Sequence, residues 1–509
     1  MVAKLHCTAF AGIEAVPVEV EVDVARQGFG APTVVGLPDA AVRESIERVR
    51  SAMRNAGYEF PRSRTVINLA PADLRKEGPA FDLPIALGIL LATESLLSDR
   101  VADYLVVGEL ALDGRIRPIR GALSAAMLTQ ARKLRGILLP RENASEAAVV
   151  AGVEVIPVET LSQAALFLAG DAQIEPATVD LDAVFARAAS YDCDFADVRG
   201  QEAVKRALTV AAAGAHNVLM IGPPGSGKTM LAKRIPTILP PLTLEESLET
   251  TRIHSVSGEL PAGVPLLATR PVRSPHHSAS IPALVGGGTV PAAGEVSLAH
   301  YGVLFLDEFP EFSRSALEAL RQPMEDARVT IARAHATVSF PASFMLVAAM
   351  NPCPCGYATD PRRPCKCTPL QVDRYLSRIS GPLVDRIDIH VEVPAVPFHE
   401  LRNQREGTSS AQMREQVLQA RTRQRERFDG STRRTNARMN GRRLREHCRL
   451  DESAERVLRQ ALTELGLSAR AHDKILRVSR TIADLAERDA IAAEDVLEAV
   501  QYRRLDRKL

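Results

Sequence analysis

The chain has 509 residues, enough for about three domains of ordinary size. Its 63 lysine and arginine residues nearly balance 62 aspartate and glutamate residues, so net charge singles out no partner, and seven cysteines, an odd number, argue against a secreted disulfide framework. No apolar run approaches the ~20 residues that a membrane helix needs, and none resembles a signal peptide, so we expect a cytoplasmic protein with no membrane partner.

The first 170 residues alternate segments with strand and helix patterns. Residues 18–24 place an apolar side chain at every second position, which predicts a half-buried strand. Residues 41–56 carry apolar residues at helical spacing with charges between them, which predicts a helix. A polar stretch rich in Asp and Ala follows, and we therefore predict a linker over residues 171–195.

A glycine-rich sequence, GPPGSGKT, follows the apolar run at 218–221 and precedes a helix-compatible segment. Strand, glycine-rich turn and helix form the context of a P-loop, in which backbone N–H groups converge on phosphate at a helix N-terminus. The lysine supplies a positive charge to the β- and γ-phosphates, and the threonine offers a hydroxyl to Mg²⁺. We therefore predict binding of ATP and Mg²⁺ by Gly222, Pro223, Pro224, Gly225, Ser226, Gly227, Lys228 and Thr229.

A long insertion over residues 250–299, rich in proline and glycine, comes next. It contains four residues that could contact nucleic acid, namely Arg270, Arg273, His276 and His277.

The apolar run at 302–306 ends in two carboxylates, Asp307 and Glu308. This pattern predicts a buried parallel strand, and the carboxyl end of such a strand is where an open α/β sheet binds ligands. Asp307 would hold Mg²⁺ through water, and Glu308 would act as the general base for the attacking water. Two acidic residues after a strand can also simply cap the next helix, but the P-loop upstream favours hydrolysis.

Residues 329–340 predict a β-hairpin with Arg333 and His335 near its tip. Basic residues at such a tip would contact phosphates without regard to base sequence. An ordinary hairpin with a solvated arginine is the alternative. A further buried strand is predicted over residues 344–350, and Asn351 at its end could orient water or start a turn before Pro352.

Two CxC pairs follow this asparagine and are formed by Cys353, Cys355, Cys365 and Cys367. Four thiolates within so short a segment can close a tetrahedral zinc site of the structural kind. The spacing is CxC instead of the commoner CxxC, so free buried cysteines and a redox pair remain alternatives. The position after Asn351 favours a clamp on a loop over a catalytic role.

Beyond Pro394 the composition predicts an all-helical domain over residues 396–509, in which Ser468-Ala469-Arg470 opens a helix. One segment is dense in arginine, and we weigh nucleic-acid contact there against a solvated helical face. Its arginines are Arg421, Arg423, Arg425, Arg427, Arg433, Arg434, Arg438, Arg442, Arg443, Arg445 and Arg449.

Several long stretches together with the P-loop carry a resemblance to a known family. They are RPVRSPHHSAS at 270–280, GGG at 286–288 with GEVSLAH after it, LFLDE at 304–308, AAMNPCPCG at 348–356 and SRISGPLVDRIDIHVEVP at 377–394. Along its whole length the chain resembles the AAA+ ATPases of the YifB/ComM group, the magnesium-chelatase-like proteins. The resemblance implies a Lon-protease-like α+β domain at 1–170, an AAA+ P-loop α/β core at 196–395 with a Cys-rich insertion, and a helical lid.

The resemblance also implies roles for three residues. Asn351 would be sensor 1, which orients the lytic water. Arg386 would be the arginine finger, a guanidinium delivered to the γ-phosphate of a neighbouring subunit. Arg378 competes for that role, and an ion pair with Asp385 or Asp388 is the alternative for Arg386.

Arg470 resembles the sensor 2 position and would contact phosphate, although Arg477 and Arg480 share its helix. Because an arginine finger works across a subunit interface, the resemblance implies a homo-oligomeric ring, expected to be a hexamer.

Two segments of the N-terminal region resemble Lon-type proteases. Residues 75–84 resemble the segment that holds the nucleophilic serine after Gly-Pro, and residues 107–115 resemble the strand before the Lon lysine. Here Ala80 stands at the serine position, and residues 118–123 hold no lysine. A Ser–Lys dyad needs both members, so proteolysis by that chemistry is excluded at this site. RadA-type recombination proteins carry a similar inactive domain, which suggests a scaffold for ring assembly or DNA engagement.

The function implied is an ATP-driven ring motor on branched or single-stranded DNA, a branch-migration helicase in recombination or natural transformation. The insertion and the hairpin would project into the pore of the ring. One alternative is the ATPase subunit of a metal chelatase, a class that lacks the Lon-like domain and the CxC cluster. Another is a protein unfoldase or assembly chaperone, for which a hydrophobic pore tip would be expected.

Overall fold

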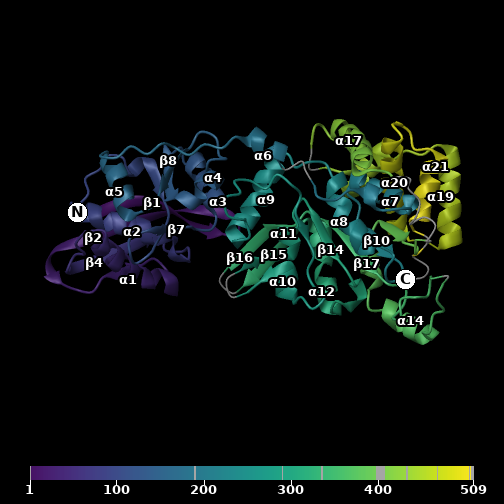
Figure 1. Cartoon of the computed structure of the whole chain (residues 1–509), viewed down its shortest axis with the longest axis horizontal. Helices are drawn as coiled ribbons and strands as arrows, with labels where there is room; N and C mark the ends of the chain where they lie inside the picture. Colours follow the sequence, from purple (N-terminus) through teal and green to yellow (C-terminus); the bar gives the residue numbers. More distant parts are fainter. Residues whose placement is uncertain are drawn as a thin grey trace. The chain divides into compact units, whose positions relative to one another are not determined.

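The chain is described by a computed structural model that divides into two compact units (Figure 1). The first unit comprises Met1–Arg187 and Ser247–Leu267, and the second comprises Ala188–Glu246 and Ala268–Leu509. The structure describes residues 2–187, 191–288, 291–333, 336–360, 362–396, 407–431, 434–466, 468–503 and 505. Among these residues, no helix has the length and apolar character that crossing a membrane requires.

A seven-stranded sheet in the order β3-β4-β2-β1-β5-β8-β9 forms the centre of the first unit. β2 pairs antiparallel with β1 and β4, whereas the other neighbours pair parallel. In β2, Val18, Val20 and Val22 are buried, which confirms the strand predicted from period-two spacing. The strands are β1 (Val2–Ala11), β2 (Glu14–Phe29), β3 (Thr33–Val35), β4 (Ser63–Ala70), β5 (Tyr104–Val106), β8 (Gly136–Pro140) and β9 (Glu154–Val158).

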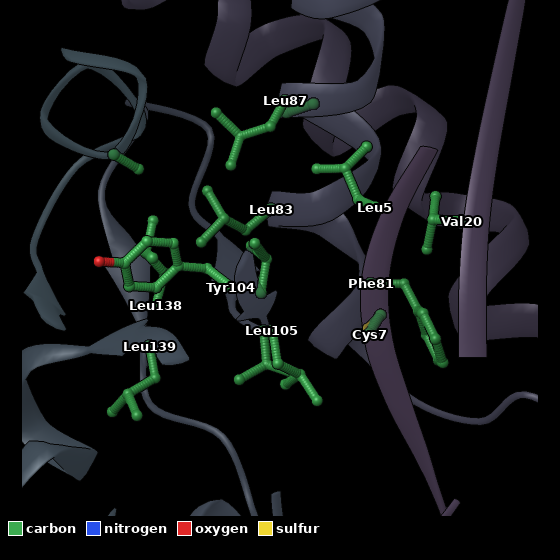
Figure 2. Packing of buried hydrophobic residues seen from close by; sticks show 14 of the residues in the cluster. Leu5, Cys7, Val20, Phe81, Leu83, Leu87, Tyr104, Leu105, Leu138 and Leu139 are labelled. Atoms are coloured by element: carbon green, nitrogen blue, oxygen red, sulfur yellow. The ribbon is translucent and has the colours of Figure 1, made fainter. Parts of the chain in front are cut away.

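Helices cover this sheet, and the predicted helix at 41–56 is confirmed as α1. The side chain of Asp39 caps α1 by accepting a hydrogen bond from the Val42 amide. α2 is apolar almost all round and buried along nearly its whole length, so it belongs to the core. Figure 2 shows Leu83 and Leu87 of α2 packed near Leu5 and Tyr104. The helices are α1 (Ala40–Asn55), α2 (Asp82–Ala92), α3 (Ala122–Ala131), α4 (Ala144–Ala147), α5 (Leu161–Ala169) and α6 (Leu181–Arg187), with the short strands β6 (Glu109–Leu110) and β7 (Ile116–Arg117).

The second unit is built on a five-stranded sheet in the order β11-β14-β17-β10-β18, with every neighbouring pair parallel. Its three central strands are buried at every residue, which is why they appear in the sequence as continuous apolar runs. The strands are β10 (Val218–Ile221), β11 (Val272–Arg273), β14 (Val303–Leu306), β17 (Met345–Met350) and β18 (Ile389–Glu392).

Around this sheet lie helices and two small antiparallel hairpins. β15 (Arg328–Arg333) pairs with β16 (Ala336–Pro341), which confirms the predicted hairpin, and β12 (Gly286–Gly287) pairs with β13 (Ala292–Ala293). The helices are α7 (Glu202–Gly214), α8 (Lys228–Ile238), α9 (Leu244–Ser257), α10 (Ile281–Val285), α11 (Glu295–Leu298), α12 (Arg314–Ala319), α13 (Arg321–Asp326), α14 (Pro369–Leu376) and α15 (Gly381–Val384). α9 begins at Leu244 in the second unit, and its residues from Ser247 onward belong to the first unit.

The C-terminal region is helical, as predicted, and shares one apolar core with the sheet of the second unit. Met413 and Ile475 belong to the same buried cluster as Val218 and Ile389. The helices are α17 (Ser410–Arg427), α18 (Gly441–His447), α19 (Glu452–Leu465), α20 (Ala469–Leu485) and α21 (Ala493–Gln501). Because the cluster is continuous, the C-terminal helices are anchored on the five-stranded sheet.

Candidate nucleotide site

The P-loop connects the end of β10 to the start of α8. Gly225 and Gly227 have φ angles of 76° and 91°, in the left-handed region that glycine adopts without steric cost. At Gly222 a Cβ atom would lie 2.2 Å from the carbonyl oxygen of Val393, so only glycine fits beside the chain that leaves β18. The sequence therefore folds into a tight turn with its backbone open toward the N-terminus of α8, a geometry suited to phosphate.

Lys228 is buried at the first position of α8. Its Nζ donates to the carbonyl oxygens of Gly222 (2.7 Å) and Pro223 (3.0 Å) and to Asn351 Oδ1 (3.2 Å). Burial lowers the pKa of the ammonium group, and the carboxylate of Asp307 partly offsets this. A cation fixed in this way, with neutral partners around it, is a strong attractor for the anionic phosphates of a nucleotide.

Thr229, in the first turn of α8, and Asp307, directly after β14, are in contact at the carboxyl ends of the parallel strands. Thr229 Oγ1 donates to Asp307 Oδ2 over 2.7 Å, and the other carboxylate oxygen of Asp307 accepts from the Glu308 amide over 2.9 Å. A hydroxyl and a carboxylate are the oxygen ligands that Mg²⁺ takes when it is bound beside phosphates. These two residues therefore fit the predicted magnesium site.

Glu308 follows Asp307 with a left-handed backbone, φ 52°, which is uncommon for a residue other than glycine. Its side chain is 57% exposed, and Oε2 lies 3.0 Å from Nδ1 of His277, whose side chain is 35% exposed. The carboxylate is thus in reach of solvent and has one side-chain partner, which the sequence did not suggest.

Asn351 stands at the end of β17, the strand between β14 and β10. Its contact with Lys228 brings it together with the P-loop. Gln201, which the sequence analysis missed, also contacts the loop: its Nε2 donates to the carbonyl oxygens of Ser226 (2.7 Å) and Pro394 (3.1 Å). The only signal for Gln201 is a Gly-Gln step just before an amphipathic helix.

Arg386 and Arg470 line one pocket of about 540 Å³ in the second unit. Arg386 donates to the Pro382 carbonyl oxygen over 2.6 Å and pairs with Glu325, and its buried Nε has no hydrogen-bond partner among the described residues. Lys474 and Arg477 line the same pocket. With Arg438, five cationic side chains line the pocket, beside the carboxylates of Glu325, Asp326, Asp385, Asp388 and Asp473.

The competing arginines have other partners. Arg378 pairs with Glu311 over 2.6 Å and reaches the Pro310 carbonyl oxygen. Arg480 is fully buried and bonds to Asp484, which assigns it to the core of the lid. Arg470 lies at the start of α20, where Ser468 caps the helix by accepting from the Ala471 amide.

The four clustered cysteines converge in space. Cys353 Sγ lies 3.4 Å from that of Cys355 and 3.6 Å from that of Cys365, and Cys355 Sγ lies 3.6 Å from that of Cys365. Backbone N–H groups of Lys366 and Tyr357 lower the pKa of the Cys355 thiol to about 6, so it ionises readily. Four sulfurs at the corners of a zinc tetrahedron would be roughly 3.8 Å apart, so this cluster matches the metal in size and in chemistry.

The basic residues considered for nucleic-acid contact lie in the β15–β16 hairpin and in the insertion at 250–299. His335 lies outside the described residues, and Arg333 is the last residue of β15. Arg270 instead binds the carbonyl oxygens of Pro240 and Tyr301, and Arg273 makes a double hydrogen bond with Glu295.

In the arginine-dense segment, the Arg421 guanidinium donates to the Ala212 carbonyl oxygen and its burial lowers its pKa to about 9, while Arg427 pairs with Asp484. These two arginines serve the fold, which favours the structural alternative for them.

In the first unit, the positions that resemble a Lon dyad have structural roles. Ala80 carries only a methyl group, and its carbonyl oxygen accepts from the Gly108 amide. The Leu123 amide donates to the buried carboxylate of Glu146, which also accepts from Ser255. These contacts agree with a domain that has kept its fold without a nucleophile.

Comparison with known proteins places the chain in a family. Models described as subunit ChlI of magnesium chelatase match residues 20–143 and 194–401, and a model of the ChlI C-terminal part matches residues 407–503. The uncharacterized protein YifB of Salmonella typhimurium is 45% identical over 510 residues, covering 100% of this chain and 98% of that protein. The chain belongs to the YifB/ComM family of magnesium-chelatase-like AAA+ ATPases.

Two further relatives extend the comparison. The competence protein ComM of Haemophilus influenzae is 44% identical over 512 residues, covering 100% of this chain and 98% of that protein. A Lon protease of Chloroflexus aurantiacus is 31% identical over 144 residues, which is 26% of this chain and 17% of that protein. The expected fold is confirmed: a Lon-like N-terminal domain, an AAA+ core with a parallel sheet and a helical C-terminal region.

Proposed function

We propose that this YifB/ComM-family ATPase is a ring motor that acts on branched or single-stranded DNA during recombination or natural transformation. The observation that carries the proposal is a chain of contacts at the carboxyl ends of the parallel strands: Lys228 bonds to Asn351, Thr229 bonds to Asp307, and the Glu308 amide bonds to Asp307. The name of the ComM relative, a competence protein, points to transformation as the setting.

Each residue of this set has one task in the proposed reaction. The P-loop amides and Lys228 hold the β- and γ-phosphates, and Thr229 and Asp307 hold Mg²⁺, which neutralises phosphate charge when bound. Glu308 accepts a proton from the attacking water, and Asn351 orients that water. Because Asn351 and Lys228 are hydrogen-bonded, the water-orienting amide and the phosphate-binding cation keep a fixed relation.

Arg386 and Arg470 support assembly into a ring, expected to be a hexamer. Both line one pocket, together with Lys474, and the buried Nε of Arg386 has no hydrogen-bond partner among the described residues. We infer that this pocket receives the γ-phosphate end of a nucleotide held by the neighbouring subunit. An arginine that stabilises the spread charge of the transition state is worth about 10³–10⁵ in rate.

We propose also that the four-cysteine cluster holds a structural zinc ion. The cluster follows Asn351 directly, and a Cβ atom on Gly356 within it would lie 2.6 Å from Cδ of Pro224 in the P-loop. The cluster therefore packs against the nucleotide loop, and a metal there would hold both Asn351 and the loop in place.

The test is the ATPase rate with and without branched DNA, with Glu308→Gln as the control. We expect forked or four-strand DNA to raise kcat severalfold, and we expect the Gln variant to bind ATP but hydrolyse it about 10²–10⁴ times more slowly because it lacks the base. A rate that no DNA structure changes would contradict the DNA motor while leaving the ATPase intact.

The metal-chelatase ATPase is the second candidate, because the family models carry that name. The match at residues 20–143 means that the first unit does not by itself separate the two candidates. ATPase stimulation by a chelatase partner and a tetrapyrrole, with none by DNA, would favour the chelatase.

A further inference from the structure

A small cavity in the second unit carries more positive than negative charge on its walls. It has a volume of about 60 Å³ and lies beside the residues that precede β14 and β17, at the amino ends of the parallel strands. The P-loop follows β10 at the opposite, carboxyl ends, so this cavity is separate from the nucleotide site. Three guanidinium groups and one carboxylate are among the described residues that line it, namely Arg270, Arg421, Arg438 and Glu246.

The carboxylate of this cavity is already paired. Arg270 Nη2 donates to Glu246 over 3.0 Å, and the other nitrogens of Arg270 donate to backbone carbonyl oxygens. Neither Arg421 nor Arg438 has a carboxylate at ion-pair distance among the described residues. One guanidinium is therefore neutralised within the cavity and two are not.

Arg421, in α17, has an incomplete set of partners. Its Nη2 donates to the Ala212 carbonyl oxygen over 3.0 Å, but its buried Nε has no hydrogen-bond partner in the part of the chain that the structure describes. Burial, and then the charge of Arg270, lower the pKa of the Arg421 guanidinium to about 9, and Glu246 offsets this only in part. The group thus keeps its proton at neutral pH, but its charge is poorly compensated.

Two further groups complete the polar lining. Thr435 is 7% exposed, and its buried Oγ1 likewise lacks a hydrogen-bond partner within the described ranges. Arg438, three residues later, is exposed and also lines the pocket of Arg386. Water can satisfy a hydroxyl and an N–H group, but it leaves the positive charge uncompensated, whereas an anion does both.

The size and the donors of the cavity limit which anion fits. Guanidinium groups match the oxygens of phosphate in geometry and in charge, and a hydroxyl adds one more donor. A volume of about 60 Å³ takes a group of a few heavy atoms, since pockets for drug-sized ligands begin at about 300 Å³. The cavity therefore suits one tetrahedral oxyanion and excludes a whole nucleotide.

We propose that this cavity binds one oxyanion of the phosphate class, held by Arg421, Thr435 and Arg438 at the amino ends of the five-stranded sheet. The ion is free inorganic phosphate or the terminal phosphate of a nucleic acid, which share this chemistry. Because Arg421 and Thr435 belong to the C-terminal region, the bound ion anchors those helices on the sheet. The stability of the second unit then depends on phosphate, independently of the function proposed above.

The test measures binding of inorganic phosphate by calorimetry and the Tm in phosphate against chloride at equal ionic strength. The parent protein carries Lys228→Ala, which removes the P-loop cation as a competing site. We expect one phosphate per chain and a Tm higher by about 3–6 °C at a concentration a hundredfold above Kd. Adding Arg421→Gln should raise the Kd roughly 10- to 100-fold, and adding Thr435→Val roughly two- to tenfold.

Thr435→Val also guards against a loss of fold. It removes a buried hydroxyl that has no partner, so its Tm in chloride should equal or exceed that of the parent. Arg470→Gln is the matched control, because Arg470 lines the pocket of Arg386 but not this cavity, and it should bind phosphate as the parent does.

Three results would overturn the inference. Phosphate that raises the Tm of the parent no more than chloride does would mean that water fills the cavity. Binding that Arg470→Gln abolishes, while Arg421→Gln and Thr435→Val keep it, would place the ion in the pocket of Arg386. A fall in the Tm of Thr435→Val in chloride would show that the hydroxyl already has a partner.

A second arm distinguishes the two sources of the ion. It compares a 5′-phosphorylated single strand of DNA with its 5′-hydroxyl form in the parent and in the Arg421→Gln protein. Tighter binding of the phosphorylated strand, lost in Arg421→Gln, would support the site with a nucleic-acid end as its ligand. Equal binding of the two strands, with inorganic phosphate bound, would support the site with the free ion as its ligand.

Discussion

At the scale of single residues, the site depends on which partner each charged group has. Lys228 has only neutral partners at hydrogen-bond distance, so its positive charge is available to an anionic ligand. The guanidinium groups of Arg270 and Arg480 instead bond to carbonyl and carboxylate groups of the fold. Arg386 is intermediate: it lines a pocket and pairs with Glu325, while its buried Nε has no hydrogen-bond partner among the described residues. Because Arg386 is not fully paired within the fold, it is the arginine whose replacement tests a catalytic role.

Replacement of Arg386 by Ala is expected to lower kcat about 10³-fold or more, with little change in the Kd for ATP, because the guanidinium acts on the transition state. If Arg386 acts on a neighbour, mixing the Ala variant with Glu308→Gln restores part of the activity. In such mixed assemblies some interfaces combine an intact base with an intact arginine. The measurement is the ATPase rate of the mixture against each variant alone.

Arg378→Ala is the matched control, since Arg378 is the other arginine in the same segment and pairs with Glu311. No recovery on mixing, with each variant folded and inactive, would show that Arg386 acts within its own subunit. Arg386→Lys keeps the ion pair with Glu325 and separates a structural loss from a catalytic one.

At the scale of elements, the loop after β17 links the cysteine cluster to the P-loop. β17 delivers Asn351 to Lys228, and the cluster starts two residues later and packs against Pro224 through Gly356. Anything that disorders this loop should therefore weaken nucleotide binding before it affects the rest of the sheet.

Cys365→Ser is expected to abolish stoichiometric zinc and to raise the KM for ATP several-fold. Metal content by elemental analysis and steady-state kinetics are the two measurements. The matched control is Cys193→Ser, because Cys193 lies outside the cluster and is only partly buried. Wild-type protein that carries no zinc, with four thiols that titrate as free groups, would contradict the metal site.

At the scale of the whole molecule, three buried polar residues join the C-terminal helices to the sheet of the second unit. His216, at the end of α7, contacts Asp388, which precedes β18, and Lys474 of α20 donates to the same carboxylate over 2.8 Å. Burial lowers the pKa of His216 below its ordinary 6.5, despite Asp388. Burial would raise the pKa of Asp388, but Lys474 and His216 outweigh it and hold that pKa well below its usual range.

These shifts predict a loss of stability in acid. Below pH 6.5 the unfolded chain binds a proton at His216 that the folded chain does not, so the free energy of unfolding falls by up to about 1.4 kcal/mol per pH unit. We expect the urea midpoint to fall from pH 7.5 to 5.5, and the fall to be smaller in His216→Gln, which cannot titrate. His6→Gln, in the first unit, is the control. Equal pH dependence in the wild type and His216→Gln would contradict this role.

Local sequence was sufficient for the parts of this protein whose geometry is local. The P-loop, the buried strand before Asp307 and the hairpin at 328–341 are each encoded by neighbouring residues, because turn glycines and strand periodicity act over short distances. The family followed from long matching motifs for the same reason, and the comparisons confirm it.

Only the tertiary structure decided which residues meet. The pairing of β11 with β14 brings His277 to Glu308, and the strand order puts Asn351 beside Lys228, contacts between residues 31 and 123 positions apart. The tertiary structure also separates basic residues that bond within the fold, such as Arg421 and Arg273, from those that line the pocket of Arg386 and Arg470. The sequence determined the chemistry available at each position, but burial and partner choice depend on contacts that span the chain, and those determine what each charge does.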